Sequence, residues 1–250
     1  MVAKYELLMK GVSAVTNEHE APAQINQGLV GGIQCLLALA AAETPVGSRD
    51  LARRLGMDPT RTNRLLGTLA YLGLAQRTPD RKYTAGSGLH VLSAMSLHAS
   101  RLLRVAMPLV EELSRNTDHV IALGVLWGRQ VCYLVHGKAN ESMTASIGGH
   151  FLFPAEQSSI GKVLLGARQE ADVRELYHDA NQEMREELIQ ELRQVQKQGA
   201  AFGVTGSIAV PVASPAIAGL AVSDVEDRRA ASTLILALKQ TADRIAAEMQ

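Results

Sequence analysis

The spacing of apolar residues changes along the chain, and this change separates two kinds of structure. Up to about residue 116, apolar side chains recur at helical intervals, most clearly in 28–42, where one face carries Leu29, Ile33, Leu36, Leu37 and Ala40. Beyond residue 117, apolar runs rich in β-branched residues alternate with charged helical runs. With 250 residues available, the pattern favours two domains, a helical one followed by one of mixed type.

Turn residues in the first part predict a helix-turn-helix. Gly56 ends a short helix over 49–55, and Ser48 is a candidate N-cap, because its hydroxyl can accept a free backbone N–H of the first turn. Pro59 begins the next helix, which stops at Gly73. Two short helices joined by a turn that contains glycine form a helix-turn-helix unit.

Two short strand-like pieces follow the second of these helices. Residues 74–77 and 82–84 flank a tip rich in turn residues, 78–81, and predict a basic two-stranded hairpin. A helix-turn-helix followed by such a hairpin is a winged helix. Residues 88–116 then predict one or two linker helices that lead into the second domain.

The second half predicts an antiparallel sheet with helices packed on it, the α+β class, because strand candidates are mixed with long helical runs. The expected strands are 119–127, 131–136, 143–147, 207–212 and 216–222. The expected helices are 159–167, 170–198 and 227–249.

The formal net charge is +0, but the charge is unevenly distributed. Residues 49–82 hold eight basic and three acidic residues, a local excess of +5. From residue 88 onward there are 15 basic and 18 acidic residues. A basic N-terminal segment joined to a mildly acidic remainder is typical of a DNA-contacting module attached to a second domain.

Several kinds of chemistry lack a motif in this chain. Cys35 and Cys132 are far apart in the sequence and lie in apolar runs, which argues against a disulfide scaffold or a zinc site and favours two buried thiols. The serines and histidines of the second half could be assembled on paper into a catalytic pair. However, no Gly-x-Ser-x-Gly elbow, metal-ligand cluster or phosphate-cradling loop supports this. The sequence therefore predicts no catalytic residue, no metal and no cofactor.

The sequence also predicts a cytoplasmic protein without a membrane contact. Its start lacks a cationic segment followed by an apolar run, so it does not resemble a signal peptide. The longest apolar stretch, 29–42, is interrupted by glycine and glutamine and is too short to span a bilayer.

With these residues in view, the chain resembles the IclR-type family of bacterial transcriptional regulators over about 25–249. The N-terminal half of the resemblance rests on Asp50-Leu51-Ala52-Arg53-Arg54-Leu55-Gly56-Met57, Arg64-Leu65-Leu66-x-Thr68-Leu69, Leu72-Gly73-Leu74, Lys82-Tyr83 and Gly88-Leu89. The C-terminal half rests on the Gly-Lys helix start in Ser159-Ile160-Gly161-Lys162-Val163-Leu164-Leu165 and on the Ala-x-Pro-Val strand in Ser207-Ile208-Ala209-Val210-Pro211-Val212. Two departures stand out: the loop 199–206 is shorter and less acidic than is usual, and Thr62 replaces an apolar residue.

The resemblance implies a fold and an activity. It implies a winged helix-turn-helix that binds operator DNA as a dimer, a linker helix, and a C-terminal GAF-like domain with an antiparallel sheet that binds a small organic effector. Dimers of this family often pair into tetramers. The expected boundaries are a flexible arm at 1–24, the winged helix at 25–87, linker helices at 88–116, and the effector-binding and oligomerisation domain at 117–250.

The recognition helix and the wing supply the expected DNA contacts. A recognition helix lies in the major groove, where Arg61 could pair with a guanine edge and Asn63 with an adenine edge, while Arg64 grips phosphate. The basic wing residues would reach the DNA backbone or the minor groove. The candidate DNA-binding residues are Ser48, Arg49, Thr60, Arg61, Thr62, Asn63, Arg64, Arg77, Arg81 and Lys82.

The expected effector site gathers small and hydroxyl-bearing residues around the start of the helix at 159–167. Free N–H groups at a helix start suit a carboxylate, so a carboxylic acid or an aromatic acid is the expected ligand. That the two late strands face this site is implied by the family resemblance. The candidates are Gly148, Gly149, Phe151, Phe153, Ser158, Ser159, Gly161, Ser207, Ala209, Ala221 and Ser223. Because of the short loop 199–206, a second hypothesis stays open: a DNA-binding regulator whose C-terminal domain has lost its ligand and only oligomerises.

Overall fold

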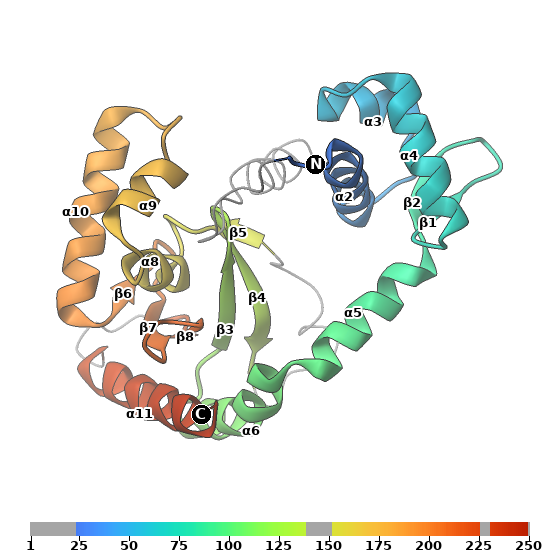
Figure 1. Cartoon of the computed structure of the whole chain (residues 1–250). Coiled ribbons are helices and arrows are strands. Elements are labelled where there is room, and N and C mark those ends of the chain that lie inside the picture. The colour runs from blue at the N-terminus through green and yellow to red at the C-terminus, as the bar shows by residue number, and fades with distance from the viewer. Residues whose placement is uncertain (1–23, 139–151, 226–230, 250) are drawn as a thin grey trace. The chain divides into compact units, whose positions relative to one another are not determined.

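The computed structural model describes residues 24–138, 152–225 and 231–249, which form two compact units divided between Ser100 and Arg101 (Figure 1). Several expectations lie outside the described residues. They are almost the whole N-terminal arm, the strand at 143–147, and the candidate site residues Gly148, Gly149 and Phe151.

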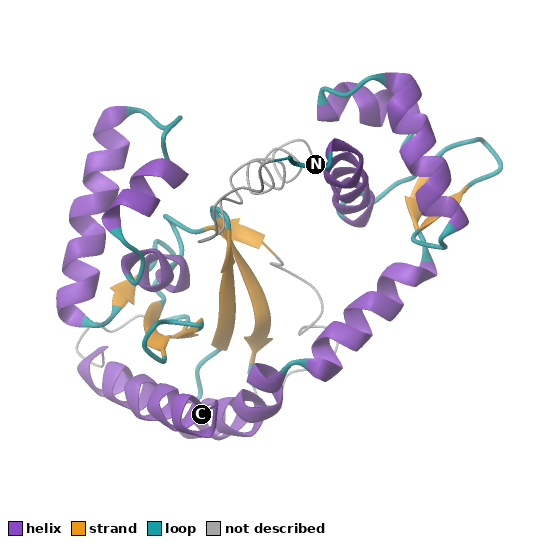
Figure 2. Cartoon of the chain, viewed as in Figure 1, coloured by secondary structure: helices purple, strands orange, loops and turns teal. Residues whose placement is uncertain are grey.

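The N-terminal unit contains helices and a two-stranded hairpin in the order expected for a winged helix (Figure 2). The elements are α2 (Gln27–Ala40), α3 (Ser48–Leu55), α4 (Pro59–Tyr71), β1 (Ala75–Arg77), β2 (Tyr83–Ala85) and α5 (Ser87–Ala99). The two strands are antiparallel, with Gln76 opposite Thr84. The predicted helix-turn-helix with its wing is therefore confirmed.

The ends of the helices show which of the predicted caps are present. Gly56 ends α3 in the left-handed conformation with φ 63°, and the Asp58 carboxylate caps α4 by accepting the Arg61 N–H at 2.8 Å. The predicted N-cap at Ser48 is wrong, because Gly47 holds that position and no side chain caps α3. The cause lies one residue earlier: Val46 is bridged to Tyr83 of β2 by two backbone hydrogen bonds of 2.8 Å, which fixes the extended chain just before the helix.

One apolar core unites the helices and the wing of the N-terminal unit. Leu39 of α2, Leu51 of α3 and Leu66 of α4 are almost completely buried in it, together with Tyr83 of β2. Cys35 is fully buried here as well, as the sequence predicts, and burial raises the pKa of its thiol to about 11.

The C-terminal unit is built on a six-stranded sheet, and this confirms the predicted α+β class with an antiparallel sheet. Its elements are α6 (Arg101–Thr117), β3 (Ile121–Trp127), β4 (Gln130–Gly137), β5 (Leu152–Pro154), α8 (Ser159–Gly166), α9 (Glu170–Leu176), α10 (Gln182–Gln198), β6 (Ala201–Phe202), β7 (Ile208–Val212), β8 (Ala218–Val222) and α11 (Ala231–Met249). The strands lie in the order β5-β4-β3-β8-β7-β6, and every neighbouring pair is antiparallel.

The two faces of this sheet carry side chains of different size. One face presents large aliphatic residues, among them Leu123 and Leu220, which pack with α6 and α11 into the main core of the unit. The other face presents alanine and glycine. Ala122 lies opposite Ala221, and Gly124 lies opposite Gly219. Alternation along each strand sends successive side chains to opposite faces, so the pattern of large and small residues sets the two faces apart.

The small face allows α8 to lie directly on the sheet. A Cβ added to Gly219 would stand 2.7 Å from Cγ2 of Ile160, and one added to Gly124 would stand 3.3 Å from the same atom. On the other side of α8, a Cβ on Gly161 would stand only 2.1 Å from the carbonyl oxygen of Ala155. These glycines are therefore needed for close packing around the start of α8.

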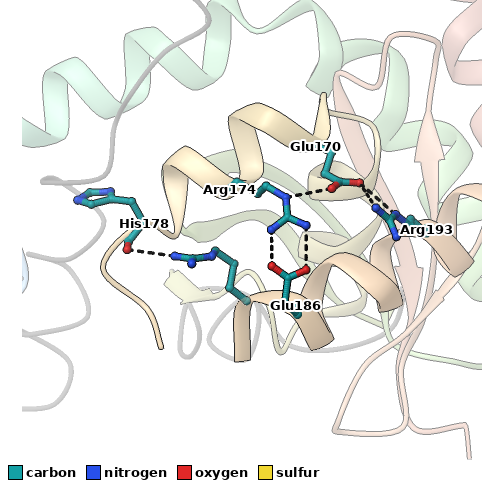
Figure 3. Close-up of polar contacts among 6 residues, drawn as sticks. Glu170, Arg174, His178, Glu186 and Arg193 are labelled. Carbon is teal, nitrogen blue, oxygen red and sulfur yellow. Dashed lines mark hydrogen bonds and ion pairs between the residues drawn. The ribbon is translucent and has the colours of Figure 1, made fainter. Parts of the chain in front are cut away.

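An ion-pair cluster joins α9 to α10 (Figure 3). Arg174 forms a two-pronged contact with the carboxylate of Glu186, and its Nε donates to Glu170 at 3.0 Å. Glu170 also accepts from Arg193 at 2.7 Å, and this contact lowers the pKa of the Glu170 carboxyl together with that from Arg174. The Arg174 contact likewise lowers the pKa of Glu186.

None of the helices in the described ranges is both long enough and apolar enough to cross a membrane.

The contact between Gly219 and Ile160 predicts a coupled effect on stability. Gly219→Ala should lower the free energy of unfolding by about 1–3 kcal/mol, because the new methyl group overpacks against Ile160. Ile160→Ala should cost about 2–5 kcal/mol by itself. Because Ile160→Ala removes the obstructing Cγ2, urea unfolding of the double variant should show a smaller loss than the sum of the two single losses. Strict additivity would contradict the packing described.

The ion-pair cluster predicts how stability changes with acid. The pKa values of Glu170 and Glu186 are lowered from their ordinary value of 4.5, so their contribution is present above that pH and is lost as the pH falls through the lowered native values. Arg174→Gln should flatten the decline in unfolding free energy between about pH 5 and pH 3, measured by urea unfolding. Lys197→Gln, which removes a positive charge from the end of α10 outside the cluster, is the control and should keep the wild-type slope.

Candidate functional site

The exposed face of α4 is the first candidate site. Thr62, Leu66 and Leu69 form the buried face of this helix. The opposite face is exposed and carries Thr60, Asn63, Arg64, Gly67, Thr68 and Tyr71. Two of these, Asn63 and Arg64, are the predicted base-reading and phosphate-gripping residues, and they lie side by side on a surface open to a large partner.

Two residues of α4 that were predicted to contact DNA, Thr62 and Arg61, do not lie on this exposed face. Thr62 is fully buried, and its hydroxyl donates to the backbone carbonyl of Asp58 at 3.0 Å, so its side chain cannot reach DNA and its prediction is corrected. Its position is the one at which the family usually has an apolar residue, and that departure was the available signal. Arg61 is half-buried, and its guanidinium donates to the carbonyl oxygen of Gln27 at the start of α2. Arg61 thus ties α4 to α2 and does not lie on the exposed face.

The wing carries the remaining predicted basic residues, and all three are exposed. The Arg77 guanidinium lies 6.0 Å from the ring centroid of Tyr83, and Lys82 forms an ion pair of 3.0 Å with Asp80. At the tip, the Thr78 hydroxyl donates to Asp80 at 2.5 Å, and this bond lowers the pKa of that carboxyl, as does Lys82. Arg81 occupies the left-handed conformation with φ 61° in this turn.

The start of α3 holds the last two predicted contacts, Ser48 and Arg49. Arg49 is exposed and Ser48 is half-buried. The sequence reasoning missed Gly67, Thr68 and Tyr71, although helical spacing from Asn63 and Arg64 was a sufficient signal, since residues three and four apart share a helix face.

The second candidate site is a cavity of about 210 Å³ in the C-terminal unit, on the small face of the sheet beside the start of α8. Small side chains leave this space, because Ala122 and Ala221 provide its floor where larger residues would fill it. Six of the predicted effector residues lie together there: Phe153, Ser158, Ser159, Ser207, Ala221 and Ser223. The other described residues of the lining are Val120, Ala122, Tyr133, His136, Thr205 and Asp224.

Hydroxyl groups from different elements meet in pairs in this cavity. The Tyr133 hydroxyl lies 3.2 Å from the Ser158 hydroxyl, which also accepts the Gly161 N–H at 3.2 Å and caps α8. The Ser159 and Ser207 hydroxyls lie 2.8 Å apart. Each pair has two protons and uses one between its members. Among the described residues, one hydroxyl proton per pair is therefore left to donate to a bound molecule.

A β-bulge brings two aromatic rings to the cavity. Tyr133 pairs with Gly124, and His136 pairs with Ala122, so Leu134 is the extra residue between the two strands. With strict alternation, residues 133 and 136 would point to opposite faces of the sheet; the bulge places both on the cavity side. Their ring centroids are 5.6 Å apart in an edge-to-face arrangement. Nothing in the residue pattern indicates this bulge, and both residues were missed as effector-site residues.

Two predicted effector residues lie beside the cavity and do not line it. Ala209 is fully buried in β7, opposite Ala221. Gly161 packs closely on Ala155, as described above, and donates its N–H to Ser158. Both shape the site through packing, and so their predicted direct contact with a ligand stays a prediction.

Few of the described residues that line the cavity carry charge. Asp224, His136 and Tyr133 are the titratable residues among them, and this described lining holds no lysine or arginine. Lys162, in the first turn of α8, is buried but directed away, because its ammonium pairs with Glu191 at 2.6 Å and donates to the Phe202 carbonyl at 3.2 Å. Within the described ranges, no group of three or more His, Cys, Asp or Glu side chains is placed to hold a metal ion.

Comparison with known proteins matches both units to one family. Residues 94–246 match the model described as bacterial transcriptional regulator IclR C-terminal, and residues 29–79 match the IclR helix-turn-helix domain. The chain is 31% identical to the HTH-type transcriptional regulator KdgR of Escherichia coli (strain K12), over 56% of this chain and 54% of that protein. It is 30% identical to the HTH-type transcriptional regulator KdgR of Dickeya chrysanthemi, over 75% of this chain and 68% of that protein.

Solved structures show the same fold at lower identity. An IclR family transcriptional regulator from Brucella abortus superposes with a TM-score of 0.79 at 18% identity, covering 96% of this chain and 97% of that one. An IclR homolog from Microbacterium hydrocarbonoxydans, complexed with 4-hydroxybenzoate, superposes with a TM-score of 0.66 at 23% identity, covering 89% of this chain and 98% of that one.

The order of a winged helix-turn-helix with an exposed α4 face, followed by a sheet domain with a cavity at the start of α8, agrees with these matches. The family models and the curated relatives are transcriptional regulators and not enzymes. The chain therefore belongs to the IclR family of bacterial transcriptional regulators, with a DNA-binding helix-turn-helix and a C-terminal effector domain.

Proposed function

We propose that this regulator binds an operator as a dimer in the cytoplasm and that a small organic molecule in the C-terminal cavity changes its operator affinity. The cavity of about 210 Å³ is the observation that carries the effector part of this proposal. The exposed face of α4 and the basic wing carry the DNA part.

The DNA part rests on shape and charge. A recognition helix inserts one face into the major groove, and the exposed face of α4 offers Asn63 for hydrogen bonds to a base edge and Arg64 for phosphate. On the wing, Arg77 and Arg81 are exposed and suited to the DNA backbone or the minor groove. Phosphate contacts supply affinity, and base contacts supply sequence preference.

The dimer part rests on α5. This helix has no buried residue, although it is rich in apolar side chains, and Leu92 and Met95 are 51% and 64% exposed. Contiguous apolar surface on a protein usually marks a contact with another molecule. A second copy of the chain is the partner that a two-fold symmetric operator requires, because each copy reads one half-site. Pairing of dimers into a tetramer is an extension of the same proposal.

The effector part rests on the size and the chemistry of the cavity. A cavity of about 150 Å³ accommodates a benzene ring, so about 210 Å³ suits one substituted ring or a similarly small acid. The rings of Tyr133 and Phe153 provide apolar walls, while the two hydroxyl pairs provide donors for an oxygen acceptor. A structural neighbour that binds 4-hydroxybenzoate supports an aromatic carboxylic acid as the class to test first.

The alternative, a C-terminal domain that only oligomerises, is less well supported. A domain that only oligomerises has no need of such a cavity, whereas this one keeps a cavity in which each of two hydroxyl pairs has a proton left to donate. A ligand changes operator affinity only if it binds one conformation better than another, so a ligand-dependent shift separates the two hypotheses.

Operator binding is tested by a salt titration on the best fragment from genome-wide DNA capture. Wild type should select a palindromic site, with affinity that falls steeply as salt rises. Arg64→Ala should weaken binding to all sequences and reduce the salt slope by about one, while Asn63→Ala should relax the preference at one base pair and cost about 1–3 kcal/mol. Arg193→Ala, which removes an exposed charge of the C-terminal unit, is the control. Equal binding of wild type to every sequence would contradict the proposal.

Effector binding is tested by calorimetry with 4-hydroxybenzoate, benzoate and hexanoate. Wild type should bind at least one of the aromatic acids, and that acid should shift operator affinity. Tyr133→Phe keeps the ring but removes one donor, so binding should weaken by about 3- to 10-fold. Ala221→Leu should abolish binding by filling the cavity floor.

The control for these variants is Ser214→Ala, in the exposed turn between β7 and β8, which should bind like wild type. Binding that is unaffected by Ala221→Leu would place the ligand elsewhere. If no acid of the panel binds, the oligomerisation hypothesis becomes the better one for this domain.

A further inference from the structure

A glycine lies in the middle of the exposed face of α4. Gly67 is exposed, and a Cβ added to it would meet nothing within 4 Å. It lies one helical turn after Asn63 and Arg64 and one turn before Tyr71, so the surface that faces outward has a gap at its centre.

The interior of the protein gives no reason for this glycine. Gly31 in α2 is explained by packing, because a Cβ there would stand 2.8 Å from Met57 and 3.0 Å from Leu65. Gly56 and Gly73 are explained by their positive φ angles of 63° and 72°. Gly67 has neither a close neighbour nor a positive φ, and it occupies an interior helical position where glycine is the poorest helix former after proline.

The neighbouring Thr68 offers no free hydroxyl group to a partner at this gap. The Thr68 hydroxyl donates to the Arg64 carbonyl of its own helix at 3.1 Å. The surface formed by Gly67 and Thr68 thus projects little from the helix, and its one hydroxyl group is hydrogen-bonded within the helix. A glycine at such a place permits close approach of another backbone or ligand.

We propose that Gly67 is a specificity-determining residue, because it lets the base edges of the major groove approach the backbone of α4 more closely than any side chain would allow. This inference rests on the proposed operator binding. It adds that the depth at which the helix is seated, and with it the base contacts of Asn63, depends on the absence of a side chain at residue 67.

The proposal predicts that stability and operator affinity move in opposite directions. In the full-length chain, Gly67→Ala should raise the midpoint of thermal unfolding by about 2–4 °C, because alanine is the better helix former. The same variant should bind the operator captured by wild type about 10-fold more weakly. Gly67→Gln, with a larger side chain, should weaken specific binding further. Both variants should keep wild-type affinity for a random duplex, because non-specific binding depends on phosphate charge.

Gly32→Ala is the matched control. Gly32 is also inside a helix, α2, with open space where a Cβ would lie. Its replacement should raise the unfolding midpoint in the same way and leave operator affinity unchanged. If Gly32→Ala weakened specific binding equally, the effect would come from a stiffer helix, and the proposal would be overturned.

Two further outcomes would also overturn it. The first is specific binding by Gly67→Ala within two-fold of wild type. The second is a lower unfolding midpoint with equal losses of specific and random-duplex binding, which would mean that Gly67 serves the fold. Failure of the proposed function itself has a different signature, since wild type would then select no operator at all.

Discussion

The arrangement of the C-terminal unit depends on the difference in side-chain size between the two faces of its sheet. The large aliphatic face makes the main core with α6 and α11, and this core fixes the sheet. The small face has room for a helix at contact distance, and Gly124 and Gly219 let Ile160 of α8 fill that room. Beside Ala122 and Ala221 no side chain of α8 fills the room. The cavity is what this packing leaves, so the elements that bury the helix also set the size of the proposed effector site.

The N-terminal unit differs, because its candidate site is an exposed surface and not a cavity. α4 buries Thr62, Leu66 and Leu69 and leaves its other face exposed. Arg61 and the bridge between Val46 and Tyr83 hold α2 and the wing in place around it. The helix that we propose to face DNA is thus supported from behind, which keeps its exposed face in one orientation without using Asn63 or Arg64.

Much of this architecture follows from local signals in the sequence. Gly56 and Asp58 act within one or two residues of their own position, so their effects on the helix ends were predictable. The N-cap prediction at Ser48 is wrong because Tyr83, far along the chain, fixes the residue before the cap. Local signals also did not reveal that the Arg61 guanidinium contacts Gln27, and its predicted contact with DNA stays a prediction. Likewise, the place of Tyr133 and His136 depends on a bulge at Leu134, and period-two alternation cannot reveal an extra residue in a strand. Ser158 and Ser159 were found because they lie at the start of a helix, and Ser207 and Ser223 because the family resemblance implies that their strands face the site, whereas Thr205 was missed.

The contacts of Lys162 also bear on how the sheet ends. The outer strand β6 is only two residues long, and the carbonyl of Phe202, one of those two residues, already accepts a hydrogen bond from the Lys162 ammonium. A short, partly engaged edge offers little to a strand from another molecule, and such edges protect sheet proteins against edge-to-edge aggregation. This edge of the sheet is therefore a poor template for strand addition by another molecule, and the same lysine that holds α8 to α10 also helps to end the sheet.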